Sequence, residues 1–319
     1  MKQSLPLSFS NSSFAINFSS NSQAILDLIS NFIDFPIETC HSKFKPIRVE
    51  IHEIPSPSTE QSHYFYLPGV EKNSQWSGGF ASHVAHVTVD SKKRDSRATV
   101  FGFEDSMKEQ LIYLGFMKPI KYVMARQGIY GVHASVCAKG ETAILIHGPK
   151  NTGKSTFVYS LQEAGYGPLC DDDCFLEVSR QKCLLHPFQT KLGAKSALIS
   201  RYPSVKANLV HNYLYGNKAR ATLRGSYIEN RFHYPRKLIL FPKFSDERKI
   251  SFRKIIPSLA MSRFIDENPN LNGKKRTAQN LKPVTRVYSA LLKSAECYQV
   301  VYNDDNIQQL PEMVDRLLR

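Results

Sequence analysis

Hydrophobic positions in the first hundred residues follow short patterns that alternate between strand and helix spacing. Residues 47–51 and 87–89 alternate apolar and polar side chains, and this period of two predicts strands; residues 14–18 also read as a strand. Residues 25–33 carry apolar side chains at helical spacing, and residues 105–125 return to a helical pattern that Pro119 divides into two pieces. We therefore expect a smaller mixed α/β module in residues 1–105.

The second part of the chain begins near Gly128 and alternates strand and helix patterns. Residues 130–138 and 142–147 read as strands joined by a turn at Lys139 and Gly140. A helix is expected over residues 154–164, ended by the glycines and proline at 165–168. Further strands are expected at 237–241 and 298–302, with a closing helix at 307–318. This order predicts an α/β domain over residues 106–319.

The segment between the strand at 142–147 and the helix at 154 is rich in glycine and reads GPKNTGKST. It satisfies G-x-x-x-x-G-K-[ST], the pattern of a loop whose backbone N–H groups cradle phosphates at a helix N-terminus. The lysine of such a loop reaches the β- and γ-phosphates and the following hydroxyl ligates Mg²⁺. The alternative is a glycine-rich turn with a solvated lysine. The nucleotide-binding residues that we expect are Gly148, Asn151, Thr152, Gly153, Lys154, Ser155 and Thr156.

Three successive aspartates, Asp171, Asp172 and Asp173, come one helix and one return strand after the loop lysine. A run of like charges is ordinarily a solvated loop. Here the chain returns beside the phosphate loop, and adjacent strand residues point in opposite directions. Two of the carboxylates could then take different tasks, one on a metal and one toward a substrate hydroxyl, and phosphoryl transfer needs both.

Two histidines stand close to the loop in sequence. His133 lies on the strand before the loop strand, and His147 is the last residue before the loop. A histidine in a strand is ordinarily a core residue with satisfied hydrogen bonds, and spacing alone assigns neither of them a chemical role.

The charge of the chain is uneven. Its 42 Lys and Arg residues exceed its 28 Asp and Glu residues, a net charge of +14. Residues 181–294 hold 23 basic and 5 acidic residues, so this segment alone carries +18. Such an excess indicates an anionic partner: a phosphorylated metabolite, an acidic peptide, nucleic acid or a membrane surface. A solvated basic face is the alternative. The candidate docking residues are Arg220, Arg224, Arg231, Arg236 and Lys237.

Length and composition exclude several classes of protein. A chain of 319 residues with 42% apolar residues builds a buried core, which excludes a disulfide-stapled miniprotein. No apolar run approaches the roughly 20 residues of a membrane helix, and the N-terminus lacks the apolar region of a signal peptide. We expect a cytoplasmic protein without a membrane partner, whose six cysteines are reduced and mostly buried.

The order GVHAS, AILIHGPKNTGKST and CDDDCFLEV resembles the catalytic domain of HPr serine kinase/phosphorylase and the related kinases, some of which phosphorylate precursor peptides. In that family a histidine precedes the loop lysine by 21 residues and an Asp-Asp pair follows it by 17 and 18. His133, Lys154, Asp171 and Asp172 reproduce these separations. The pattern extends over residues 106–319, and its motifs over residues 131–178. Residues 186–200 lack the Arg-Gly-rich signature of the HPr kinases, and a metal-binding glutamate of that region has no counterpart.

The resemblance implies a role for each matched residue. Asp171 would be the general base toward a hydroxyl, His133 would orient it, Lys154 would act on the transferring phosphate, and Ser155 and Asp172 would hold Mg²⁺. The implied function is ATP- and Mg²⁺-dependent phosphorylation of serine or threonine in a peptide or protein, by a chain that could assemble as a homo-oligomer. A small-molecule hydroxyl is the alternative acceptor. The alternative class is a nucleotide-binding regulatory or nucleic-acid-binding protein, although no zinc finger or RNP-type aromatic motif supports nucleic acid as a partner.

Overall fold

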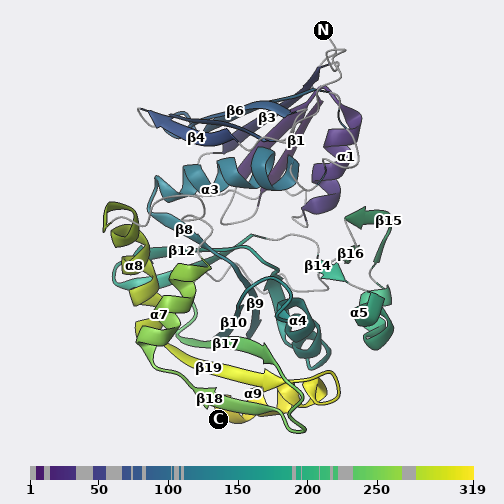
Figure 1. Cartoon of the computed structure of the whole chain (residues 1–319), viewed down its shortest axis with the longest axis vertical. Helices are drawn as coiled ribbons and strands as arrows, with labels where there is room; N and C mark the ends of the chain where they lie inside the picture. Colours follow the sequence, from purple (N-terminus) through teal and green to yellow (C-terminus); the bar gives the residue numbers. More distant parts are fainter. Residues whose placement is uncertain are drawn as a thin grey trace. The chain divides into compact units, whose positions relative to one another are not determined.

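The chain folds into two compact units, which are described separately. The computed structural model describes residues 5–10, 15–33, 46–54, 67–72, 75–80, 84–101, 103, 108, 111–188, 192–194, 196–207, 209–215, 218–221, 233–267 and 278–319. The units are Met1–Gln127 and Gly128–Arg319, and both combine helices with mixed sheets (Figure 1). Across these described ranges, no helix is both long and apolar enough to cross a membrane.

The first unit is built on one mixed sheet. Its seven described strands follow the order β1-β2-β3-β7-β6-β5-β4, in which β2, β3 and β7 run parallel. Helix α1 buries its apolar stripe, as its spacing predicts. The elements are β1 (Leu5–Ser10), β2 (Ala15–Ser20), α1 (Gln23–Phe32), β3 (Ile47–Ile54), β4 (Leu67–Lys72), β5 (Gln75–Phe80), β6 (Val84–Asp90), β7 (Asp95–Phe101), η2 (Leu111–Met117) and α3 (Lys118–Ala125).

The helical segment at the end of the first unit belongs to its sheet. The π-helical turns η2 pass directly into α3, and Pro119 lies in the first turn of α3. The ring of Phe116 packs edge-on against Phe18 of β2, with centroids 5.8 Å apart. Because these helices pack here, the division between the units falls after Gln127, later than the boundary at residue 105 that the sequence suggests.

The second unit has a larger mixed sheet and two smaller ones. The larger sheet has the order β11-β9-β10-β17-β19-β18 in the described residues, with β10, β17 and β19 parallel. The smaller sheets are β13-β12-β8 and β14-β16-β15. The elements are β8 (Ile129–Val132), β9 (Ala134–Lys139), β10 (Thr142–His147), α4 (Lys154–Glu163), β11 (Gly167–Cys170), β12 (Cys174–Ser179), β13 (Lys182–Pro187), β14 (Leu192–Ala194), α5 (Ser196–Arg201), α6 (Pro203–Ala207), β15 (Leu209–Tyr215), β16 (Lys218–Ala221), β17 (Arg236–Phe244), β18 (Ser251–Lys254), α7 (Pro257–Asp266), α8 (Ala278–Lys293), β19 (Ala295–Tyr302), η3 (Ile307–Gln309) and α9 (Leu310–Leu318).

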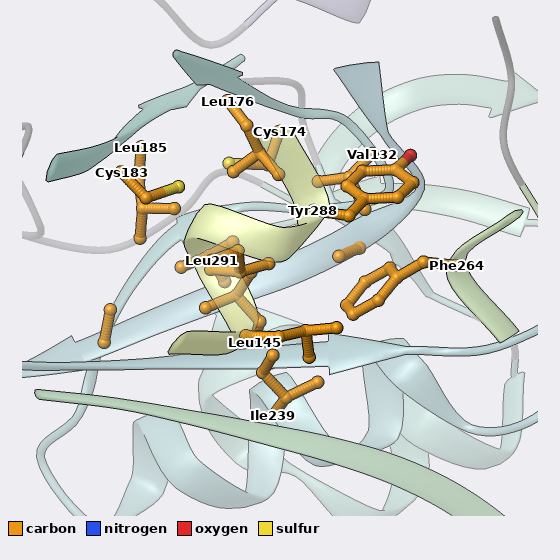
Figure 2. Packing of buried hydrophobic residues seen from close by; sticks show 14 of the residues in the cluster. Val132, Leu145, Cys174, Leu176, Cys183, Leu185, Ile239, Phe264, Tyr288 and Leu291 are labelled. Carbon is orange, nitrogen blue, oxygen red and sulfur yellow. The ribbon is translucent and has the colours of Figure 1, made fainter. Parts of the chain in front are cut away.

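Successive strand residues point to opposite faces of the larger sheet, and other elements cover each face. Leu145 and Ile239 face a core shared with α7, α8 and the β13-β12-β8 sheet, where Figure 2 shows them with Phe264, Tyr288 and Leu291. On the other face, the alternate residues of β10 and β17 pack with α4, η3 and α9. The five described cysteines are buried free thiols, as expected, and Cys40 lies outside the described residues.

Several predicted boundaries differ from the structure, and the strands expected at 237–241 and 298–302 are longer, at Arg236–Phe244 and Ala295–Tyr302. The single strand expected at 130–138 is two strands, because β8 pairs with β12 whereas β9 pairs with β10, and the chain changes sheets at His133. Gly167 and Pro168, expected to end a helix, begin strand β11 instead. The closing helix starts at Leu310, after the short 3₁₀ turn η3.

The carboxyl ends of β10, β17 and β19 meet at one edge of the larger sheet, since these strands are parallel. They end at His147, Phe244 and Tyr302. Ligands of open α/β sheets bind at this kind of edge. The glycine-rich loop leaves β10 there.

Candidate active site

The glycine-rich loop turns sharply between a buried strand and a helix. Every residue of β10 is buried, and α4 begins at Lys154, directly after the loop. Asn151 and Gly153 have φ values of 70° and 90°, the left-handed region that favours glycine. The loop therefore delivers the N-terminus of α4, with its unpaired N–H groups and positive dipole end, to the sheet edge.

Lys154 folds back into the loop. Its side chain is only 6% exposed, and Nζ donates to the carbonyl oxygens of Gly148 at 3.0 Å and Pro149 at 3.1 Å. The same Nζ lies 3.6 Å from Asp172 Oδ1. A cation is thus held where the loop pattern predicts the phosphate-contacting lysine.

Asp171 is the buried carboxylate of the site. It is 2% exposed and accepts a 2.6 Å hydrogen bond at Oδ1 from Ser135 Oγ. Ser155 Oγ, in the first turn of α4, donates to Asp171 Oδ2 at 3.2 Å. The loop hydroxyl and this carboxylate are therefore direct neighbours.

Asp172 faces the more open side of the site. Its side chain is 30% exposed, and Oδ1 lies 3.6 Å from Lys154 Nζ and 3.7 Å from His133 Nε2. Asp172 has a φ of 66°, so the backbone turns at this residue between β11 and β12. This turn separates the two carboxylates. The structure groups His133 with Asp172 and Ser155 with Asp171, whereas the resemblance groups them the other way round.

Asp173 is held by its backbone. Its side chain is buried, its N–H donates to the Asp171 carbonyl at 2.9 Å, and its own carbonyl accepts from Phe188 N–H at 3.0 Å. These bonds pin the aspartate turn to the end of β13.

His133 sits at the point where the chain passes from β8 to β9. Its side chain is 29% exposed, and its carbonyl oxygen lies 2.8 Å from Nδ1 of His147. The change of sheets at this residue positions the imidazole at the mouth of the site, beside Asp172.

His147 is a buried linker beneath the loop. Its Nδ1 faces the His133 carbonyl at 2.8 Å and its Nε2 faces the Arg263 carbonyl at 3.3 Å. Its ring packs against Phe264 and Phe241, with centroids 4.4 Å and 5.6 Å away. Burial lowers the pKa of His147 to about 4, so the imidazole is neutral at pH 7. His147 therefore ties the loop strand to α7 and does not act as an exposed base.

Two residues of the site escaped the sequence analysis. Ser135 bonds Asp171, and it follows His133 by two residues on the strand that pairs with β10. Tyr302 donates from its hydroxyl to the carbonyl oxygen of Thr152 in the loop at 3.0 Å. The position of Ser135 on the predicted hairpin could have indicated that it lies near the loop. The contact of Tyr302 could not be predicted in this way, because 150 residues separate Tyr302 from Thr152 in the sequence.

The oxygen donors of the site fit a magnesium ion. No group of three or more His, Cys, Asp or Glu residues is placed to hold a metal by itself, as far as the described residues go. Mg²⁺ in kinase sites takes one or two carboxylates, with substrate phosphates and water completing the shell. The hydroxyl of Ser155 and the carboxylate of Asp171 supply ligands of that class.

Two candidate docking residues of the basic segment, Arg236 and Lys237, bond backbone carbonyls of the second unit. Arg236 bonds the carbonyl oxygens of Leu317 and Leu318 near the C-terminus. Lys237 is buried and donates to the Tyr234 carbonyl at 2.5 Å, and burial lowers its pKa. These two residues support the fold. The remaining candidates lie outside the described residues (Arg224 and Arg231) or outside the described side chains (Arg220).

Comparison with known proteins adds a distant similarity. No family model and no curated protein matches the chain. Among solved structures, the HPr(Ser) kinase/phosphatase from Coxiella burnetii aligns with 15% identity and a TM-score of 0.24, over 59% of this chain and 93% of that chain. The similarity is too distant for any role to be transferred from it.

Proposed function

We propose that the second unit is an ATP- and Mg²⁺-dependent kinase that phosphorylates a hydroxyl group, with serine or threonine of a peptide or protein as the acceptor. The supporting observation is that Lys154 and two aspartates in unlike surroundings converge at the loop. The choice of a serine or threonine acceptor rests on the resemblance of residues 131–178.

The loop would bind the triphosphate. The N–H groups at the start of α4 are donors for phosphate oxygens, and the helix dipole favours negative charge there. Lys154 now bonds two loop carbonyls, and phosphate oxygens would replace them as stronger, charged acceptors. Lys154 then neutralises charge that develops on the transferring group.

Ser155 and Asp171 would hold the metal. They are neighbours at 3.2 Å, and a loop hydroxyl together with a carboxylate is the usual protein ligand set for Mg²⁺ at a phosphate loop. Bound Mg²⁺ supplies charge neutralisation on the phosphate oxygens. Ser135, donating to the same carboxylate, keeps Asp171 in place.

Asp172 would be the general base. It is the more exposed of the two carboxylates and lies beside Lys154, near the end of the nucleotide that reacts. The acceptor oxygen attacks the γ-phosphorus, its proton passes to Asp172, and the bond from the γ-phosphorus to the bridging oxygen breaks to release ADP. His133, 3.7 Å from Asp172, would orient this carboxylate. These roles exchange the two aspartates relative to the assignment that the resemblance implies.

A label-transfer experiment tests the proposal. The chain is incubated with Mg²⁺ and [γ-³²P]ATP in the presence of a library of serine- and threonine-containing peptides, and separately with small hydroxyl compounds. We expect label on peptide hydroxyls and none with Lys154→Ala. Label only on small compounds would change the acceptor class. Hydrolysis without transfer, or nucleotide binding alone, would contradict the kinase proposal and favour a nucleotide-dependent regulator.

A further inference from the structure

Tyr302 reaches the phosphate loop from the far end of the chain. It ends strand β19, its side chain is buried, and its hydroxyl donates to the carbonyl oxygen of Thr152 at 3.0 Å. The contact is so close that a Cβ added to Gly153 would lie 1.8 Å from the Tyr302 hydroxyl oxygen. Only glycine fits at residue 153 beside this ring, and its φ of 90° also favours glycine.

The bonded carbonyl fixes a donor on the opposite side of the same peptide plane. The Thr152 carbonyl and the Gly153 N–H belong to one peptide unit, which is planar and trans, so the two groups point in opposite directions. When Tyr302 holds the carbonyl, the N–H of Gly153 faces away from Tyr302.

We propose that Tyr302 is a positioning residue for the nucleotide: it holds the peptide between Thr152 and Gly153 so that the Gly153 N–H donates to a phosphate oxygen of the bound polyphosphate. This inference rests on the proposed function for the identity of the ligand. Tyr302 acts through the loop backbone and touches no reacting atom.

The surroundings of Tyr302 make it a rigid support. Its ring packs edge-on against Phe157 of α4 and Phe244 of β17, with centroids 4.9 Å and 5.7 Å away. The carbonyl of Tyr302 accepts from the N–H of Ser245 at 2.9 Å, which fixes the end of β19 against the chain leaving β17. Burial raises the pKa of Tyr302 to about 12, so the hydroxyl keeps its proton and remains a donor at neutral pH. A buried, packed support of this kind orients a binding group with little reorganisation.

The Tyr302→Phe variant tests the proposal, because it removes the hydroxyl and keeps the ring. The affinity for ATP and for inorganic tripolyphosphate is measured by calorimetry, and the KM values for ATP and for the acceptor are measured where transfer occurs. We expect binding of both polyphosphates to weaken about fivefold to tenfold, the size of one lost hydrogen bond. The KM for ATP should rise by the same factor, and the acceptor KM should not change.

Tyr166→Phe is the matched control. Tyr166 is buried in the same core and donates from its hydroxyl to Asp315 at 2.5 Å, so this variant also loses a tyrosine hydrogen bond. It should lower the melting temperature and leave the polyphosphate affinity at the wild-type value.

The outcomes separate this inference from the kinase proposal. Wild-type affinity in a folded Tyr302→Phe variant would overturn the inference, and so would equal weakening in Tyr166→Phe. If the wild-type chain binds tripolyphosphate and transfers no label, the kinase proposal fails, and the role of Tyr302 is still decided by the binding measurements. A wild-type chain that binds no polyphosphate would overturn both.

Discussion

The two sides of the glycine-rich loop are built differently. On one side, Asp172 and His133 are each about 30% exposed, and the ion-pair distances among Asp172, His133 and Lys154 are 3.6 to 3.7 Å. On the other side, Tyr302 is 4% exposed, packed between aromatic rings and bonded to the loop at 3.0 Å. The comparison indicates that the two sides of the loop have different tasks. The open side holds groups that can change partners when substrates arrive, and the packed side holds the backbone that must not move.

Removing the cation of the loop, Lys154, should have the largest effect. Lys154→Ala deletes the charge that the loop carbonyls and Asp172 now surround. We expect phosphoryl transfer to fall by at least about 10²-fold to 10³-fold, as for other preorganised donors to a transition state, together with weaker ATP binding. Initial rates of label transfer and ATP calorimetry measure these changes. The circular dichroism spectrum should be unchanged. Near-normal transfer by this variant would contradict the role of Lys154.

Neutralising each aspartate in turn should separate base from metal ligand. Asp172→Asn should lower the transfer rate by about 10²-fold or more at saturating Mg²⁺-ATP, because a general base is lost. Asp171→Asn should instead raise the Mg²⁺ concentration needed for half-maximal rate, because Asp171 adjoins the Ser155 hydroxyl. The measurement is a magnesium titration of the rate in each variant. Reversed phenotypes would restore the assignment that the resemblance implies, and two neutral variants would show that neither aspartate takes part in the reaction.

His147, buried beneath the loop, should also impose a pH dependence on stability. Its pKa is about 4 in the folded chain and about 6.5 when unfolded, so between these pH values the unfolded chain binds more protons. The contribution of His147 to the free energy of unfolding is fully present above pH 6.5 and is lost as the pH falls to 4. At 1.36 kcal/mol per pKa unit the loss is about 3 kcal/mol.

Denaturant unfolding at several pH values measures this contribution. His147→Gln should flatten the dependence between pH 6.5 and 4, whereas the same change at His52, whose side chain is 40% exposed, should leave the dependence as in the wild type. An equally steep dependence in His147→Gln would show that other groups cause it.

The smallest expected effect concerns capture of an anionic acceptor by the basic segment. Arg220→Ser together with Arg224→Ser should raise the acceptor KM a few-fold at low salt. Raising the salt to about 0.2 M should raise the wild-type acceptor KM and leave the KM for ATP less changed, because exposed charges are screened beyond a Debye length of about 8 Å. Steady-state kinetics across a salt series measure both values. An acceptor KM independent of salt would mean that the basic segment is a solvated face.

The parts of the site that could be predicted from the sequence are those encoded in contiguous residues or fixed spacings. The loop from Gly148 to Ser155 and the helix after it are local features, and the structure confirms their secondary structure. The spacing of His133 and the aspartates from Lys154 also singled out residues that lie close together in the structure, with Asp172 3.6 Å from Lys154 and 3.7 Å from His133. Local sequence patterns could not indicate which strands and side chains lie next to each other in the folded chain. Tyr302 reaches the loop only through the order of strands in the sheet.

Adjacent residues with similar chemistry are equally hard to assign from the sequence. Asp171 and Asp172 differ in their partners because the backbone turns at Asp172, where φ is 66°. The strand pattern of residues 130–138 likewise gave no sign that the chain changes sheets at His133, since the partners β12 and β10 are fixed only by pairing in space. Both the different partners of the two aspartates and the change of sheets at His133 depend on tertiary contacts.

One pair of measurements tests most directly whether the two sides of the loop have different tasks. The equilibrium dissociation constant for ATP and the single-turnover transfer rate at saturating ATP are determined for Asp172→Asn and Tyr302→Phe. The account predicts that Asp172→Asn lowers the rate by about 10²-fold or more with little change in affinity, and that Tyr302→Phe weakens affinity by about fivefold to tenfold with little change in rate. If both variants altered the same parameter, the two sides of the loop would not have separate tasks, and the account would be contradicted.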